Sequence, residues 1–144
     1  MSRIVVGTLC VLSLAACSEP FATIPGGQLA GELGDAPIAW NDVPKTVQLE
    51  TRPTDPYSIN IWSVAIGADL YVATSADGTT WSGFIAEDRS VKVRLSRRLY
   101  PLHAARVDDP AERARVAAAY LAKYDVDEDD GWVVQGLIFR LDRR

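Results

Sequence analysis

The spacing of hydrophobic positions changes several times along this chain, and each spacing predicts a particular element. Val47 and Leu49 alternate with polar residues, which predicts a first strand. The densest run of Ile, Val, Trp and Tyr covers residues 57–66, a Gly-Ala-Asp turn follows, and residues 70–74 are again mainly apolar. This order predicts a β-hairpin that is buried on both faces.

Two helices are predicted between the remaining strands. Trp81, Phe84 and Ile85 fall at helical spacing over residues 80–88. A second helix should begin at residues 109–112, where the aspartate can cap, the proline suits the first turn and the glutamate can complete a capping box. Its apolar stripe is expected to consist of Val116, Ala117, Tyr120, Leu121 and Tyr124.

Three further strands complete the predicted fold. Residues 91–95 alternate between apolar and basic side chains, residues 99–107 read as extended, and residues 132–141 form the last apolar run. Pro101 places the second of these strands at an edge or a bulge. The resulting order favours a mainly β (α+β) fold, a small barrel of about six strands with two helices, over a parallel α/β sheet.

The chain opens with the pattern of an export signal. Arg3 supplies a positive charge, and residues 4–14 form an apolar run that is shorter than the roughly 20 residues of a membrane-crossing helix. Leu14-Ala15-Ala16-Cys17 follows. This ending resembles the lipobox of bacterial lipoproteins, in which diacylglycerol alkylates the cysteine and cleavage falls just before it. The resemblance implies a signal peptide over residues 1–16 and a lipid on Cys17.

A lipid on Cys17 would fix the location of the protein. We expect it in the cell envelope on the periplasmic side, with the membrane as its partner through that lipid. Ser18, rather than aspartate, follows the cysteine, and by the sorting rule for such lipoproteins this favours the outer membrane where a cell has two. The alternatives are an ordinary secretory peptide with an incidental cysteine and a start codon placed too far upstream.

Composition divides the exported chain into two parts. Residues 17–37 are rich in Gly, Pro and Ala, which predicts a flexible tether, and residues 38–144 are predicted to form the barrel domain. The signal would remove Cys10, so the domain has no disulfide and depends on its core. Without residues 1–16 the chain carries 14 basic and 19 acidic residues, a formal charge of −5. This charge argues against nucleic acid or anionic lipid as the main partner.

The middle of the chain resembles a known superfamily. The pattern consists of Leu70–Ser75, a glycine turn, Thr79-Thr80-Trp81, a short helix, Val91–Leu95 and Asp108–Arg113. Over about residues 46–141 it is similar to the split-barrel flavin and deazaflavin oxidoreductases, which include pyridoxamine-phosphate-oxidase-like proteins and deazaflavin-dependent nitroreductases. The resemblance implies a split β-barrel, FMN or a deazaflavin as candidate cofactor, and a homodimer as candidate assembly.

The same resemblance implies a cofactor-binding site in the turn before the short helix. Thr74, Ser75, Thr79 and Thr80 match the zone that cradles the cofactor phosphate, and Trp81 matches a tryptophan common at the helix start in the deazaflavin branch. Amides at a helix start together with hydroxyl groups can bind an anion. The alternative is that the hydroxyl residues only form turns and that the tryptophan plugs the barrel mouth.

The expected cation is missing from this zone. Residues 74–82 contain no Lys or Arg, and a phosphate binds less strongly without a cationic partner. Arg94, Arg97 and Arg98 are the candidates to compensate. With Lys92 they form a basic cluster, whose alternatives are a solvated strand face and a surface for an acidic partner.

No catalytic or metal-binding residue is assigned. His103 is the single histidine, which excludes a metal site built on histidines, and no Gly-x-Ser-x-Gly elbow accompanies it. Residues 125–131 are acidic, but Gly136 occupies the twelfth position, where a calcium loop needs a glutamate. A solvated loop is the better interpretation of that run.

Three functions remain open from the sequence. The first is a lipid-anchored envelope protein whose barrel binds a small ligand or a protein partner. The second is a flavin- or deazaflavin-dependent oxidoreductase. The third is a structural lipoprotein that docks onto a larger envelope complex, for which an exposed apolar patch is expected.

Overall fold

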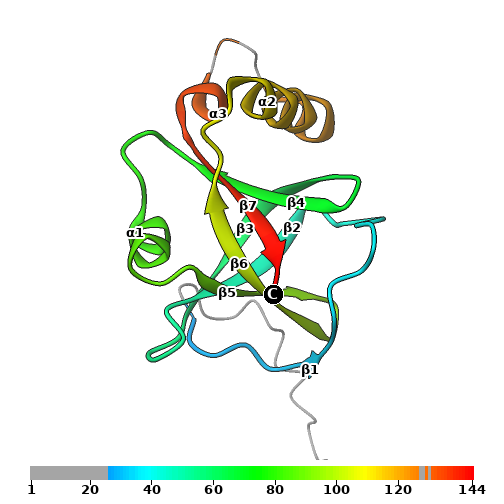
Figure 1. Ribbon diagram of the computed structural model, residues 1–144, viewed down its shortest axis with the longest axis vertical. Helices are drawn as coiled ribbons and strands as arrows, with labels where there is room; N and C mark the ends of the chain where they lie inside the picture. The colour runs from blue at the N-terminus through cyan, green and yellow to red at the C-terminus, as the bar shows by residue number, and fades with distance from the viewer. Residues whose placement is uncertain (1–25, 127–128, 130) are drawn as a thin grey trace, which may run out of the picture.

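Six antiparallel strands close into a barrel, and a short additional strand lies parallel to one of them. The computed structural model describes residues 26–126, 129 and 131–144 (Figure 1). Its elements are β1 (Glu32–Leu33), β2 (Thr46–Thr51), β3 (Tyr57–Ile66), β4 (Asp69–Thr74), α1 (Thr80–Glu87), β5 (Ser90–Leu95), β6 (Arg98–Arg106), α2 (Pro110–Tyr124), α3 (Trp132–Gln135) and β7 (Leu137–Arg143). The predicted fold class is confirmed, and α3 adds a third helix.

Two long strands form the corners of the barrel. Residues 57–62 of β3 pair with β2, whereas residues 63–66 pair with β4. In β6, residues 98–103 pair with β5 and residues 102–106 pair with β7. Each corner strand is therefore shared by two small sheets that enclose one interior. Pro101 lies in the stretch of β6 between its partners β1 and β7, so this part of the strand has the edge character expected for proline.

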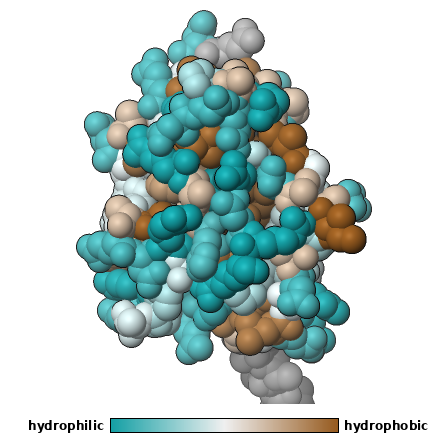
Figure 2. Space-filling view, in the orientation of Figure 1, coloured by the Kyte–Doolittle hydropathy of each residue, from teal (hydrophilic) through white to brown (hydrophobic). Residues whose placement is uncertain are grey.

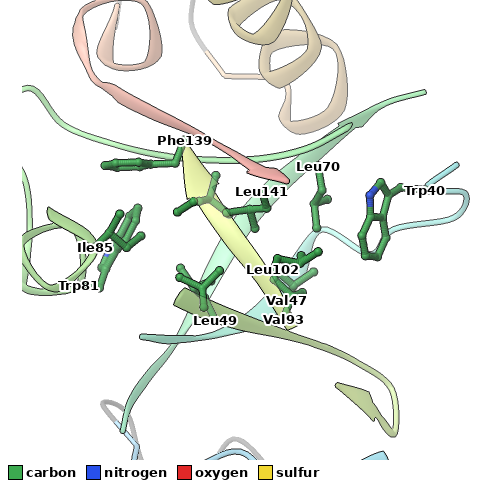
Figure 3. Packing of buried hydrophobic residues seen from close by; sticks show 13 residues of the cluster. Trp40, Val47, Leu49, Leu70, Trp81, Ile85, Val93, Leu102, Phe139 and Leu141 are labelled. Carbon is green, nitrogen blue, oxygen red and sulfur yellow. The ribbon is translucent and has the colours of Figure 1, made fainter. Parts of the chain in front are cut away.

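The inward-facing side chains fill the barrel with apolar groups. Trp81 meets Phe139 edge to face, with ring centroids 5.7 Å apart, and Trp40 lies on the other side of the aliphatic centre (Figure 3). Fully burying one large aliphatic side chain stabilises a fold by roughly 1.5–3 kcal/mol. The buried cluster consists of Trp40, Val47, Leu49, Leu70, Val72, Trp81, Ile85, Val91, Val93, Leu102, Ala104, Phe139 and Leu141.

Helix α2 covers the outer face of β3, β4 and β7 (Figure 1). It begins as predicted, because Asp109 accepts the Glu112 N–H at 2.8 Å and Pro110 occupies the first turn. The Tyr71 hydroxyl donates to Glu112 Oε1 at 2.9 Å, and the Arg140 guanidinium donates to the same oxygen at 2.8 Å. Burial, followed by this bond to Glu112, raises the pKa of Tyr71. The network joins two strands to the helix.

The prediction of a strand over residues 132–141 is wrong at its start. Trp132 and Val133 belong to α3, which packs on α2, and the strand begins only at Leu137. Two glycines explain the change of direction. Gly131 has a positive φ of 56°, and a Cβ on Gly136 would lie 2.2 Å from the Thr74 carbonyl oxygen. Only glycine permits this conformation and this close approach.

Residues 26–45 wrap around the barrel as an extended segment that we call the strap. At its start Gly26 pairs with Ser58, and the Leu29 N–H donates to the buried Glu50 carboxylate at 2.6 Å. Further along, β1 pairs with β6, and Trp40 enters the barrel core at 6% exposure. Residues 26–37, for which the sequence predicts a flexible tether, are therefore part of the folded domain.

The predicted lipid attachment lies outside the described residues. Signal residues 1–16, Cys17 and the tether up to residue 25 all fall there, and these assignments stay predictions. None of the helices in the described part of the chain combines the length and the apolar character that a membrane crossing requires.

Candidate functional site

The five predicted cofactor-binding residues lie together in sequence but face different surroundings. Thr74 ends β4 and is buried, Ser75 is exposed in the following turn, and Thr79 and Thr80 are exposed at the start of α1. Trp81 points into the barrel, where only 6% of it is exposed. The tryptophan therefore packs in the core, and Ser75, Thr79 and Thr80 lie on an open turn, while the assignment of the five residues to a cofactor stays a prediction.

The start of α1 satisfies its own polar groups. The Thr79 N–H donates to Ser82 Oγ at 2.8 Å, and the Ser82 hydroxyl donates back to the Thr79 carbonyl at 2.9 Å. The Gly78 N–H donates to the Ser75 carbonyl at 2.9 Å. These bonds occupy donors that an anion would otherwise use. With no basic residue between positions 74 and 82, this turn by itself offers an anion no charged partner.

A cleft of about 450 Å³ opens beside the same helix, where α1 faces the ends of β6 and β7. We call it the mouth cleft. The residues that line it come from three elements and from the loop before β5: Ser82, Ile85, Ala86, Arg89, Ala104, Ala105, Arg106, Leu137 and Phe139. It combines an apolar floor with two arginines.

Strand alternation explains why the two arginines line the same cleft at this end of the barrel. Val91 of β5 and Ala104 of β6 face the interior, and side chains two residues apart share a face. Arg89 precedes Val91 by two positions, and Arg106 follows Ala104 by two. Because β5 and β6 are antiparallel, both arginines fall where the inward-facing rows leave the barrel.

Each arginine keeps donors that the described residues do not use. Arg89 Nε donates to the Ala104 carbonyl at 3.0 Å, and the Ala104 N–H donates back to the Arg89 carbonyl at 2.8 Å. These bonds hold the Arg89 backbone and stem in place. Arg106 Nε lies 3.3 Å from the Asp108 carboxylate. The Nη nitrogens of both arginines have no partner among the described residues, so they are available to a ligand.

The apolar floor and the local charges complete the cleft. Ile85 and Phe139 are buried and Leu137 is half-buried. Asp88 is not among the residues that line the cleft; its carboxylate accepts the Ser90 N–H at 2.8 Å, and this bond lowers its pKa. The arrangement suits a molecule with one anionic group and one flat apolar part, because charge-assisted bonds and apolar contact would form side by side.

The basic cluster expected to compensate for the missing cation serves the strap instead. Lys92 Nζ lies 2.8 Å from the buried Glu50 carboxylate, and Arg94 donates to the Ala30 carbonyl at 3.1 Å. Arg97 lies 3.9 Å from Glu32 of β1. None of the cluster lines the mouth cleft.

The other candidates from the sequence take no part in the site. His103 is exposed on β6. Of the acidic run at 125–131, residues 127, 128 and 130 lie outside the described part of the chain, and Asp125 caps the end of α2. Within the described residues no group of three or more potential ligands could hold a metal ion.

Solved structures share this fold. A conserved hypothetical protein from Mycobacterium tuberculosis is 18% identical, with a TM-score of 0.58 over 70% of this chain and 74% of its own. A candidate pyridoxamine 5′-phosphate oxidase from Listeria innocua is 11% identical, with a TM-score of 0.56 over 70% and 85%. An FAD-binding protein from Mesorhizobium loti is 13% identical, with a TM-score of 0.52 over 71% and 83%.

These likenesses show that the chain shares its barrel fold with the three solved structures. Another similar chain is described as a domain-swapped dimer, with a TM-score of 0.56 and 13% identity. No family model and no curated protein matches the sequence. At such low identity the fold is what is shared.

Proposed function

We propose that this chain is a lipid-anchored protein of the cell envelope whose barrel binds an anionic small molecule in the mouth cleft. The observation that carries the ligand proposal is the placement of Arg89 and Arg106 beside the floor made by Leu137 and Phe139. Guanidinium groups bind phosphate or carboxylate through charge-assisted hydrogen bonds, and a planar ring can pack on such a floor. No residue is assigned a catalytic role.

A phosphorylated flavin or deazaflavin is the ligand that we place first. It joins an anionic group to a planar ring, and the cleft falls within the roughly 300–1,000 Å³ of typical ligand pockets. Arg89 and Arg106 would hold the phosphate, while Phe139 would lie against the ring and exclude water from it. A bound flavin would supply electron-accepting chemistry. The similar FAD-binding protein and candidate pyridoxamine 5′-phosphate oxidase support this choice, and they favour an oxidoreductase as the second candidate function.

Titration with two related flavins tests the ligand. FMN and riboflavin share their ring but differ in the phosphate, so the arginines should discriminate between them. We expect binding to quench the fluorescence of the flavin. FMN should saturate the protein at a concentration at least about tenfold lower than riboflavin does, since a bond to a charged group is worth about 1.5–3 kcal/mol. Equal affinities, or no binding of either, would contradict the proposal. The mass of the protein in solution, measured with and without FMN, tests the predicted homodimer.

The anchor rests on the sequence Leu14-Ala15-Ala16-Cys17 and is tested separately. Mass spectrometry of the protein extracted from membranes should find Cys17 as the first residue, carrying diacylglycerol and an acyl group on its amine. A Cys17→Ser variant should lack both modifications. A mature chain that begins elsewhere, or a bare Cys17 thiol, would contradict the proposed lipid anchor.

A further inference from the structure

The strap exposes two large aliphatic side chains, which lie seven and twelve positions after Gly26 in the sequence. Ile38 is 92% exposed and Leu33 is 70% exposed. In the described part of the chain the other large hydrophobic residues with high exposure are Trp62 and Val134, and Trp62 already stacks on Tyr124 with ring centroids 4.5 Å apart. In Figure 2, apolar atoms reach the surface at the lower end and right-hand edge of the view, the region that β1 and the following chain occupy in Figure 1.

The backbone that carries these two exposed side chains is held in place by the fold. Leu33 belongs to β1 and pairs with Leu99 of β6. Arg143 Nη2 donates to the Ile38 carbonyl at 2.9 Å and also to the Pro37 carbonyl. The fold therefore holds both side chains in water at fixed positions. Single exposed aliphatic residues are common, but two on one short fixed segment make a candidate contact surface.

We infer that the strap end of the domain lies against the bilayer surface that carries the lipid, with Leu33 and Ile38 inserted among the headgroups. This inference rests on the proposed lipidation of Cys17. Gly26 stands nine positions after Cys17, and a chain of that length spans at most roughly 30 Å. The radius of gyration of a domain of about 100 residues is about 13 Å, so the anchor keeps the strap within reach of the membrane.

The charges around the two aliphatic residues identify the kind of surface. Arg97 and Arg98 lie beside β1, but Glu32 and Asp35 lie on the strap itself. The local charge is mixed, which agrees with the acidic balance of the whole protein and disfavours attraction to anionic lipid. Arginines can reach lipid phosphates while aliphatic side chains insert at the interface. The partner we assign is therefore the zwitterionic headgroup region of the bilayer.

Fluorescent probes on the lipidated protein test this orientation. Once the signal is removed and Cys17 is alkylated, a newly introduced cysteine is the one free thiol, because the sequence holds only Cys10 and Cys17. We would label Leu33→Cys, Ile38→Cys and, as reference, Ala118→Cys on the exposed face of α2, in neutral vesicles that carry a headgroup quencher. The two strap probes should be quenched at least about fivefold more than the reference, since interfacial contact buries side chains only about 5–10 Å deep. Equal quenching at all three sites would overturn the inference.

A second set of variants tests the aliphatic contact itself. A probe at Asp35→Cys should lose its quenching when Leu33→Gln and Ile38→Gln are introduced together. Val134→Gln removes an exposed aliphatic residue from α3 and should leave that quenching unchanged. If the double variant keeps full quenching, the inference fails. Co-sedimentation with vesicles separates the two proposals, because failure to co-sediment refutes the lipid anchor, whereas uniform quenching of anchored protein refutes only the orientation.

Discussion

Arginines occur at both ends of the barrel, and their partners differ. At the strap end Arg94 donates to the Ala30 carbonyl and Arg143 donates to the Ile38 carbonyl. At the mouth, Arg89 contributes only Nε to the Ala104 carbonyl, and Arg106 has a single contact with Asp108. The first group of arginines fastens the chain to itself, whereas the Nη donors of the second group have no partner in the described part of the chain.

This difference shows that a dense run of basic residues does not locate a binding site. Lys92, Arg94, Arg97 and Arg98 are close in sequence, and their strands bring them to the strap. The mouth arginines stand seventeen positions apart in the sequence, and only the register of β5 and β6 brings them together. A site is indicated by spare donors above an apolar floor.

The largest effect on this comparison should come from removing the strap's aromatic anchor. Trp40 lies in the barrel core and meets Tyr100 edge to face at 5.2 Å. We expect Trp40→Ala to lower the free energy of unfolding by about 3–5 kcal/mol, as for other large aromatic residues in cores. Urea denaturation followed by circular dichroism measures this loss. Ile38→Ser is the matched control on the same segment and should change stability by less than about 0.5 kcal/mol. If Trp40→Ala also lowered the free energy of unfolding by less than about 0.5 kcal/mol, the strap would not be part of the fold.

A smaller effect is expected at the buried ion pair beneath the strap. The Glu50 side chain is 3% exposed, while that of Lys92 is 29% exposed. Lys92→Met would leave the Glu50 carboxylate with the Leu29 N–H as its described partner. We expect the free energy of unfolding to fall by about 2 kcal/mol. This is below the range for fully buried pairs because solvent reaches the lysine. Thermal unfolding measures it. Arg94→Gln, which removes one exposed hydrogen bond, should cost less than about 1 kcal/mol; equal losses in the two variants would contradict the account.

High pH should weaken the hydrogen bond that joins Tyr124 to Lys45, the last residue of the strap. The Tyr124 hydroxyl lies 2.6 Å from the Lys45 carbonyl and from the Ser63 carbonyl, and burial raises the pKa of this tyrosine above its ordinary 10.0. The unfolded chain therefore loses its proton first, so stability should fall as the pH rises above 10 towards the folded-state pKa. Burial lowers the pKa of Lys123, so the folded chain loses this proton before the unfolded chain does. This group alone would therefore make stability rise as the pH increases towards 10.5.

The Tyr124→Phe variant isolates this contribution. It should lose about 1–3 kcal/mol at neutral pH, because the variant removes both the bond that the hydroxyl donates and the bond that it accepts from the Ser63 N–H. Its stability should then fall less steeply than that of the parent protein between pH 10 and about 11. Denaturant unfolding across this range provides the comparison. Identical pH profiles would show that the tyrosine does not titrate in the unfolding transition.

Most of the fold could be predicted because its signals are local. Alternation at Val47 and Leu49, the dense run at residues 57–66 and the cap at Asp109 each depend on near neighbours in the chain. The strap could not be predicted in this way. Residues 26–37 gain order from long-range partners such as Glu50 and β6, and their Gly and Pro content is also typical of a tether.

The site was only partly accessible to sequence reasoning. The resemblance led to the turn at residues 74–81, which borders α1, but it gave no reason to select Arg89 and Arg106. A signal was present, because each arginine continues the inward-facing alternation that runs through Val91 or Ala104. Recognising it requires the pairing of β5 with β6, which the sequence does not specify.

Binding of FMN to matched arginine variants tests the central claim most directly. Arg89→Gln with Arg106→Gln should weaken FMN binding by at least about a hundredfold, since two charge-assisted bonds of about 1.5–3 kcal/mol each are lost. Riboflavin affinity should be unchanged. Arg97→Gln with Arg98→Gln removes the same charge from the strap end and should leave FMN binding within about twofold of the parent protein, because exposed charges at a distance are screened. Equal weakening in both pairs, or weakening only in the strap pair, would contradict a ligand site at the mouth.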